Sequence, residues 1–292
     1  MLRDVAYTPG AFDVRARTSD GWTLFGERLE NPDASAVVVL GHAMMVDRRT
    51  LDRPPGDGLA SELHRAGLDV LFFDVRGHGE SGPLAEDGAR WRYDDIVRLD
   101  VPALVEAGRE VARGRPVALL GHSLVGHAAL ISAGLSPERA PDALVAYAPN
   151  IWLRDLEPSR AARAAKRLTL FAWKTMTHLR GHFDPRPFGV GRTGESAGYV
   201  DEFTSFFTEG LGDYARALDA ARLDVLSVSS EGDRFLAPVR EVERFVGLAR
   251  NANIETIVLE GDEAPDHMGL VTDPRSRALW RKTAHWILRR SV

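Results

Sequence analysis

Short apolar segments rich in β-branched residues alternate along this chain with longer segments of helical periodicity. The apolar segments are almost continuously hydrophobic, as expected of parallel strands that are covered on both faces. Strands that alternate with helices predict an α/β fold with a mostly parallel, doubly wound sheet. The predicted strands are 36–40, 70–73, 116–120, 143–146, 225–229 and 254–259, and the predicted helices are 58–66, 94–112, 126–133, 238–250 and 276–288.

An N-terminal hairpin and one long insertion complete the predicted fold. Residues 12–17 and 22–29 flank a Ser-Asp-Gly turn, which predicts a hairpin at the edge of the sheet. After residue 148 the alternation stops, and a connection of this length needs a structure or a function of its own. We therefore predict an α/β core of residues 1–148 and 222–292, with a helical cap, or lid, inserted at 149–221.

The predicted cap consists of helices at 159–178 and 200–221, with the Gly- and Pro-rich stretch 181–198 between them. It is also rich in aromatic residues, which are expected to fill a small core of the cap, to line an apolar pocket over the active site, or to do both. The aromatic residues expected at a substrate pocket are Trp152, Phe171, Trp173, Phe203, Phe206 and Phe207.

Composition restricts the partners of the chain. The 292 residues are 44% hydrophobic, which is enough for a sizeable core, and the net charge is −5. Without a long basic run or a basic–aromatic stripe, no nucleic-acid partner is expected. No apolar run approaches the roughly 20 residues that span a bilayer, so no membrane insertion is expected either. The oligomeric state stays open.

The absence of cysteine excludes disulfides, thiolate zinc sites and cysteine nucleophiles. The first residues, MLRDVAY, lack the basic and apolar regions of a signal peptide, so a cytoplasmic protein is the default expectation. Two histidine pairs, His122 with His127 and His178 with His182, lack an H-E-x-x-H or similar pattern. We therefore expect no catalytic metal and no cofactor.

The strongest chemical signal is the segment 117–127, VALLGHSLVGH, in which an apolar strand runs into Ser123 and an Ala/Leu-rich helix follows. This arrangement is typical of a nucleophile elbow, where a strained turn exposes the serine hydroxyl above the sheet. Ser123 is therefore the predicted nucleophile, against the alternative of a serine that only caps a helix. The N–H group of Leu124, at the start of the helix, is the first predicted oxyanion donor.

One position departs from the usual elbow pattern. The five-residue motif normally ends in glycine, but Val125 occupies that place and the glycine comes one residue later, at Gly126. A valine is expected to crowd the approach of the helix to the strand. The helix is therefore expected to lie slightly farther out or to be shifted.

The second oxyanion donor is expected in the loop that follows the 36–40 strand, because acyl-transfer sites use an N–H group from a loop in this position. Many such loops read His-Gly-x, whereas here His42 is followed by Ala43. Met44 is the preferred donor and Ala43 the alternative. His42 itself is expected to brace the loop.

A nucleophilic serine needs a base and a group that orients the base, in the chain order Ser, acid, His. Asp233 follows the 225–229 strand and is the predicted acid, with Glu231 as the second choice and a solvated acidic turn as the structural alternative. His267 follows the last strand and is the predicted base. The later His285 lies inside the terminal helix, where packing is the expected role.

Four segments in this order make the chain resemble the α/β-hydrolase superfamily: 41–46, 74–81 (DVRGHGES, expected to be structural), 121–126, and the loops of Asp233 and His267. Among its branches the chain is most similar to serine hydrolases with an all-helical cap, and it resembles bacterial esterase- or lipase-like members. The resemblance implies a catalytic triad of Ser123 as nucleophile, His267 as base and Asp233 as its orienting acid. It implies no particular substrate.

The main functional hypothesis is a serine esterase that cleaves a small-molecule carboxylic ester, or a related acyl bond, through an acyl-enzyme on Ser123. The aromatic cap favours an acyl or aromatic group of moderate size. An acyltransferase or thioesterase with the same triad is the nearest alternative. A non-catalytic binding protein on a hydrolase scaffold is the alternative from another class, but a scaffold has no physical need for all three triad residues.

Overall fold

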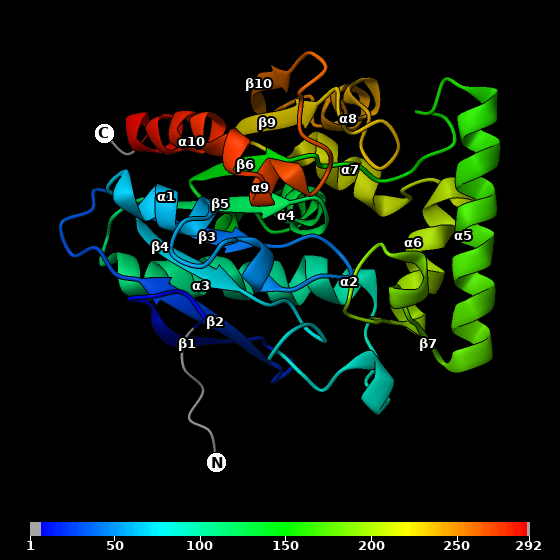
Figure 1. Cartoon of the computed structure of the whole chain (residues 1–292), viewed down its shortest axis with the longest axis horizontal. Coiled ribbons are helices and arrows are strands. Elements are labelled where there is room, and N and C mark those ends of the chain that lie inside the picture. The colour runs from blue at the N-terminus through cyan, green and yellow to red at the C-terminus, as the bar shows by residue number, and fades with distance from the viewer. Residues whose placement is uncertain (1–6, 291–292) are drawn as a thin grey trace.

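A computed structural model describes residues 7–290 of the chain, and one eight-stranded sheet lies at its centre (Figure 1). The strand order is β1-β2-β4-β3-β5-β6-β9-β10. All pairs from β4 to β10 are parallel, whereas β1 pairs antiparallel with β2, and β2 with β4. The strands are β1 (Phe12–Arg17), β2 (Thr23–Leu29), β3 (Val37–Gly41), β4 (Asp69–Phe73), β5 (Val117–His122), β6 (Ala143–Tyr147), β9 (Asp224–Ser230) and β10 (Asn253–Leu259).

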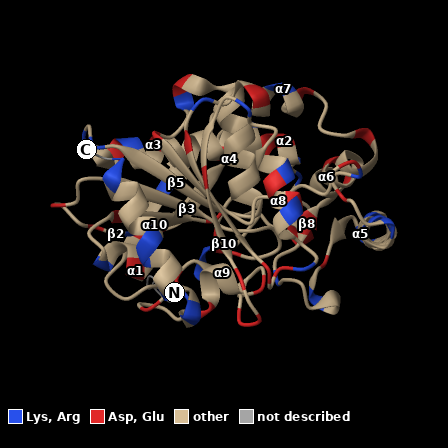
Figure 2. Ribbon diagram, turned by 90° about the horizontal axis from the view of Figure 1, so that it is seen from above, with Lys and Arg blue, Asp and Glu red and all other residues tan. Residues whose placement is uncertain are grey.

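Helices cover both faces of the sheet, so the predicted doubly wound α/β-hydrolase fold is confirmed (Figure 2). One face carries α3 and α4, and the other carries α1 and α10, which pack on each other. The central strands β3, β4, β5 and β6 are buried at every position, which explains their continuous hydrophobicity. The helices are α1 (Leu59–Arg65), α3 (Val101–Ala112), α4 (Leu124–Leu135), α8 (Val239–Val246), α9 (Gly269–Thr272) and α10 (Arg277–Arg289).

The helix predicted at 94–112 is not a single regular helix. It begins as α2 (Tyr93–Asp95), passes through a π-helical turn at Ile96–Asp100 and continues as α3. Pro102, in the first turn of α3, cannot donate an N–H group to the preceding turn. A π turn directly before a proline absorbs this break in the hydrogen-bond ladder.

The segment between β6 and β9, called the insertion here (residues 149–221), contains α5 (Arg160–Arg180), α6 (Ala197–Glu209) and α7 (Asp213–Ala220). The predicted single helix at 200–221 is wrong, because α6 ends at Glu209 and the next residue, Gly210, has a positive φ of +76° that does not continue a helix. The Gly- and Pro-rich stretch also forms a small antiparallel pair, β7 (His182–Phe183) with β8 (Glu195–Ser196), so the insertion is not entirely helical.

Helices α5 and α6 stand beside one end of the sheet, whereas α7 packs against α4 of the core (Figure 1). Their contact is close, because a Cβ atom on Gly134 would lie 1.7 Å from the carbonyl oxygen of Ala217. The division into an α/β core of residues 1–148 and 222–292 and a cap of residues 149–221 stays a prediction. Residues 1–6 and 291–292 of the predicted core lie outside the described part of the chain. These include all but one of the first seven residues, on which the expectation of no signal peptide rests.

The contact between β5 and α4 explains how the chain accommodates Val125. A Cβ atom on Gly121 would lie 2.3 Å from the nitrogen of Gly126, so strand and helix approach as closely as two glycines allow. Val125 points instead at Gly41 of β3, where an added Cβ atom would lie 2.4 Å from its Cγ1 atom. The expected outward displacement of the helix is therefore not seen, because Gly41 provides the space that the valine needs.

This complementarity predicts a specific pair of mutant effects. Gly41→Ala should lower the free energy of unfolding by about 1–3 kcal/mol, because the new methyl group overlaps the Val125 side chain. In the Gly41→Ala protein, Val125→Ala should cost less than it does in the wild type, since it removes the overlapping atoms. Denaturant unfolding of the four proteins measures this coupling. Strictly additive effects would contradict the account.

Candidate active site

The elbow places Ser123 between β5 and α4 in a strained conformation. Its φ of 48° and ψ of −102° lie outside the regions that L-residues usually occupy. Its N–H group donates to the carbonyl oxygen of Tyr147 at 2.8 Å, which ties the turn to the neighbouring strand β6. Strain of this kind persists only where the surrounding structure fixes it, and it clusters at functional sites.

Asp233 and His267 lie together although they are 34 positions apart in the sequence. They occupy the loops that follow β9 and β10, and His267 Nδ1 lies 2.5 Å from Asp233 Oδ2. The other carboxylate oxygen accepts the N–H groups of Leu236 and Ala237, at 3.1 and 3.0 Å. The aspartate is therefore held by three hydrogen bonds.

The environment of Asp233 favours its ionised form. Burial raises the pKa of this carboxyl, but the hydrogen bond and charge of His267 and the two backbone N–H groups outweigh burial, so the pKa lies below its ordinary value. Glu231, the second choice for the acid, is exposed and accepts the N–H group of Gly261 at 2.8 Å. Within residues 7–290, no hydrogen bond joins Glu231 to His267.

Ser123 and His267 line one small cavity of about 80 Å³ together with Ala43 and Met44. Within the described residues, the Ser123 hydroxyl makes no hydrogen bond to His267. Such bonds are often long or misaligned without a substrate and tighten when it binds. The structure thus brings the predicted nucleophile, the predicted base and the predicted oxyanion loop to one space.

The predicted pocket aromatics divide into three groups. Trp152, Trp173 and Phe203 line the cavity. Phe206 and Phe207 are buried in the hydrophobic core, and the ring of Phe206 packs against Tyr93 and Tyr214. These two residues therefore do not line the cavity, although their burial agrees with the alternative role in packing. The remaining residue, Phe171, is exposed.

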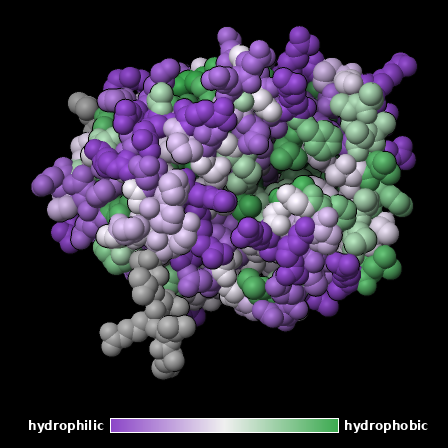
Figure 3. Space-filling view, in the orientation of Figure 1, coloured by the Kyte–Doolittle hydropathy of each residue, from purple (hydrophilic) through white to green (hydrophobic). Residues whose placement is uncertain are grey.

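Phe171 was wrongly expected at the pocket. Its side chain is 68% exposed, and it lies on the outer face of α5 with Leu168 and Leu179. Figure 3 shows hydrophobic residues gathered over this helix. Two side chains that are two positions apart on an α-helix point in directions about 200° apart around its axis. Trp173 and Phe171 therefore cannot both face the cavity.

Two polar residues of the cavity wall were missed in the sequence. Asn150 lies three positions after the end of β6, and its place beyond the carboxyl end of a parallel strand could have indicated a site residue. Its Nδ2 group donates to the carbonyl oxygen of Leu236 at 2.9 Å. The second residue is His127, whose Nδ1 atom lies 2.7 Å from the hydroxyl of Tyr93. Burial, aided by the charge of His267, lowers the pKa of His127 to about 3, so its ring is neutral.

The predicted oxyanion loop is held from both sides. His42 donates from Nδ1 to the carbonyl oxygen of Ala43 at 2.7 Å and accepts the Val75 N–H group at Nε2, at 3.1 Å. His42 thus braces the loop from the core. Burial, followed by the charge of His78, lowers the pKa of His42 to about 3, which agrees with a ring that accepts a hydrogen bond.

The insertion holds the other side of this loop through Glu195. Its Oε1 atom accepts the N–H group of Met45 at 2.9 Å, and the carbonyl oxygen of Met45 accepts the N–H groups of Arg192 and Thr193. Because the Met45 N–H group is occupied, it is not free to bind an oxyanion, and the choice between Met44 and Ala43 stays open. The role of Glu195 carried no signal in the sequence, since the Gly- and Pro-rich stretch around it has no periodicity that would predict β8.

Glu195 also forms a buried ion pair with His78. The Nε2 atom of His78 lies 3.1 Å from Oε1 of Glu195, and its Nδ1 atom lies 2.9 Å from the carbonyl oxygen of Arg76. With an acceptor at each ring nitrogen, the imidazole must carry both protons. Burial lowers the pKa of His78, but the charge of Glu195 outweighs burial and raises it.

This pair predicts a large effect on stability. Glu195→Ala should lower the free energy of unfolding by about 3–5 kcal/mol, because it leaves a buried imidazole without its counter-ion and the Met45 N–H group without its acceptor. Glu209→Ala, at the exposed end of α6, is the matched control and should change it by less than about 0.5 kcal/mol. Chemical denaturation measures both. Equal effects of the two substitutions would contradict the role of Glu195 as the partner of His78 and Met45.

The described residues hold no group of three or more His, Asp or Glu side chains arranged to bind a metal ion. None of the helices within residues 7–290 is long and apolar enough to span a bilayer.

Comparison with known families identifies the chain. A family model described as "Serine aminopeptidase, S33" matches residues 32–187, which is more than half of the sequence. The chain belongs to this family of hydrolases. The predicted resemblance to the α/β-hydrolase superfamily is thereby confirmed.

Two curated relatives from Mycobacterium tuberculosis match part of this α/β-hydrolase. The uncharacterized proteins MT2364 (strain CDC 1551) and Rv2307c (strain H37Rv) are each 31% identical to it over 152 residues. The match covers 51% of this chain and 49% of each relative, so the chain spans about half of their length.

Solved structures share the fold over nearly the whole α/β-hydrolase chain. The Pyrococcus furiosus esterase Pf2001 has a TM-score of 0.63 at 21% identity, covering 97% of this chain and 91% of that one. DcsB, solved in complex with a substrate analogue, has a TM-score of 0.68 at 14% identity, covering 97% and 99%. At these identities the likeness concerns the fold.

Proposed function

We propose that this α/β-hydrolase cleaves a carboxylic ester through an acyl-enzyme formed on Ser123. The observation that carries the proposal is the buried hydrogen bond between His267 and Asp233, next to the cavity that both His267 and Ser123 line. A structural neighbour, Pf2001, is an esterase by name. This agrees with the proposal but does not decide it, because one fold hosts many activities.

The proposed mechanism begins with the tautomer of His267. Since Nδ1 carries the proton that is donated to Asp233, Nε2 is left as the basic nitrogen. It removes the proton from the Ser123 hydroxyl as the oxygen attacks the acyl carbon. The ionised Asp233 stabilises the imidazolium that forms. Ordinary acid–base chemistry of a serine hydrolase thus follows from one oriented ring.

The tetrahedral intermediate needs donors for its oxyanion. The proposed donors are the N–H group of Leu124, at the start of α4, and that of Met44, with Ala43 as the alternative. Removing one such donor typically costs about 2.7–4 kcal/mol of transition-state stabilisation. His267 then protonates the leaving alcohol, and a water molecule that it activates hydrolyses the acyl-enzyme.

The size of the cavity refines the expected acyl group. About 80 Å³ is well below the 300–1,000 Å³ that is common for whole-ligand pockets. Trp152, Trp173 and Phe203 close it, and the first two rings stack with centroids 6.0 Å apart. In place of the moderate-sized group expected from the aromatic content, the proposed substrate carries a short acyl chain.

Serine substitution tests this proposal. Ser123→Ala should lower kcat/KM for p-nitrophenyl acetate by about 10⁴-fold or more, because the step that forms the acyl-enzyme is lost. Ser205→Ala, on α6, is the matched control and should retain wild-type turnover, since among the described residues the Ser205 hydroxyl bonds only to the carbonyl oxygen of Glu202. Wild-type turnover by a folded Ser123→Ala protein would refute the proposal.

A further inference from the structure

A second and much larger hollow adjoins the catalytic cavity. This hollow has a volume of about 890 Å³ and lies between the loop that follows β3 and the insertion. It is called the arginine groove here, because Arg49, Arg53, Arg186 and Arg192 line it. Val190 and Met268 line both the groove and the cavity, so these two side chains stand between them. A molecule with one end in the cavity would extend past these side chains into the groove.

The groove is basic although the chain as a whole has a net charge of −5. Its lining contains four arginines and a single carboxylate, that of Asp47. The arginines come from both walls: Arg49 and Arg53 from the loop after β3, and Arg186 and Arg192 from the insertion. Two walls of the same charge attract a negative group placed between them.

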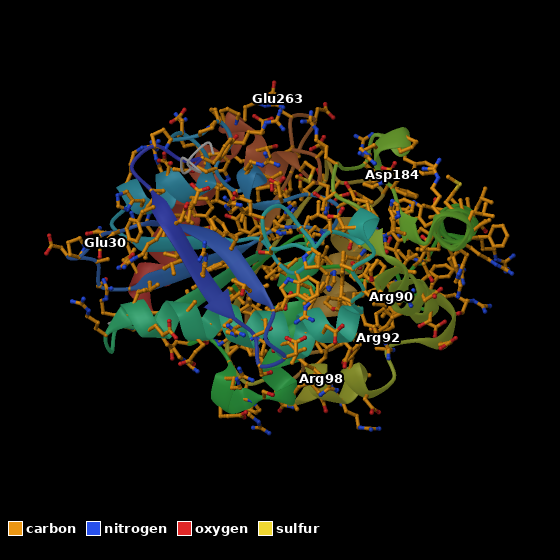
Figure 4. The ribbon with its side chains drawn as sticks, turned by 90° about the horizontal axis from the view of Figure 1, so that it is seen from below. Glu30, Arg90, Arg92, Arg98, Asp184 and Glu263 are labelled. Carbon is orange, nitrogen blue, oxygen red and sulfur yellow. The ribbon has the colours of Figure 1, made fainter. Side chains whose placement is uncertain are left out.

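Two of the four arginines are already neutralised. Arg49 pairs with Asp47, and Arg186 pairs with Asp184, which is labelled in Figure 4, through Nε at 2.8 Å. Arg53 and Arg192 face the groove from opposite walls and form no ion pair with any described residue. They are the two guanidinium groups left to bind an anion, which such groups hold by paired N–H donors.

From this arrangement we infer that the preferred substrate is a short-chain ester whose alcohol part carries a carboxylate or a phosphate. This inference rests on the proposed function. The apolar cavity, with about a tenth of the groove's volume, takes the small acyl group, and the groove takes the anionic alcohol part. The bond between the acyl carbon and the leaving oxygen breaks as Ser123 is acylated, and His267 gives its proton to that oxygen.

Matched esters test the inference. The neutral substrate is phenyl acetate, and the anionic ones are 4-carboxyphenyl acetate and 4-acetoxyphenyl phosphate, which separate a carboxylate from a phosphate. The measured quantity is the ratio of kcat/KM for an anionic ester to that for phenyl acetate. Comparing this ratio between proteins cancels the intrinsic reactivities of the esters.

Reversing the two free charges should lower the ratio. In the double variant Arg53→Glu and Arg192→Glu we expect a fall of about tenfold or more for at least one anionic ester. The double lysine variant should keep most of the preference, because it keeps the charges. Arg216→Glu, on the exposed surface of α7 and outside the groove lining, should leave the ratio unchanged. Higher ionic strength should reduce the wild-type ratio.

The outcomes separate this inference from the proposed function. A ratio that stays within twofold of wild type in the double glutamate variant would overturn the groove assignment, whatever the activity on phenyl acetate. Phenyl hydrogen succinate carries its carboxylate on the acyl side. A higher kcat/KM of the wild type for this ester than for both esters with an anionic alcohol part would also overturn the groove assignment. Binding of 4-carboxyphenyl acetate and phenyl acetate to the Ser123→Ala protein, measured by calorimetry, tests the groove without any turnover. Tighter binding of the carboxylate supports it, and equal binding contradicts it.

Discussion

The close packing of α4 on β5 is the constraint on which the proposed site depends. Gly121 and Gly126 allow the helix and the strand to touch, and the turn between them holds Ser123 at a φ of 48°. A side chain at either glycine would push the helix away and relax the turn. Val125 does not interfere, because Gly41 on the adjacent strand leaves room for it. The space for one side chain in the elbow is thus supplied by a glycine more than 80 positions earlier.

The second organising contact joins the insertion to the predicted oxyanion loop. Glu195 accepts the Met45 N–H group and pairs with His78, so a residue of the insertion helps to fix a loop of the core. Arg192 follows the same path, since its N–H group bonds to Met45 while its side chain lines the groove. The short stretch from 190 to 195 therefore touches the cavity, the groove and the loop. In the proposed mechanism, this one segment would therefore take part both in substrate selection and in positioning the oxyanion donors.

Much of the core could be predicted from the sequence, because its signals are local. The central strands are buried and almost continuously hydrophobic, and Ser123, Asp233 and His267 each follow a parallel strand at the carboxyl edge of the sheet. The insertion was harder, since its irregular stretch has no period that would indicate β7, β8 or the role of Glu195. Phe171 shows the limit of composition, because an aromatic residue on a helix faces the cavity or the solvent according to a rotation that depends on tertiary packing. The pairing of Val125 with Gly41 also joins positions that no local pattern links.

The central claim is that Ser123 is a nucleophile activated by His267, and a fluorophosphonate probe tests it most directly. The probe phosphonylates an activated serine, and mass spectrometry identifies the modified residue and the stoichiometry. The account predicts one label per chain, on Ser123. The His267→Ala protein should not be labelled. The His285→Ala protein should be labelled like the wild type, because His285 lies on the exposed side of α10. No label on folded wild-type protein, or a label on another serine, would contradict it.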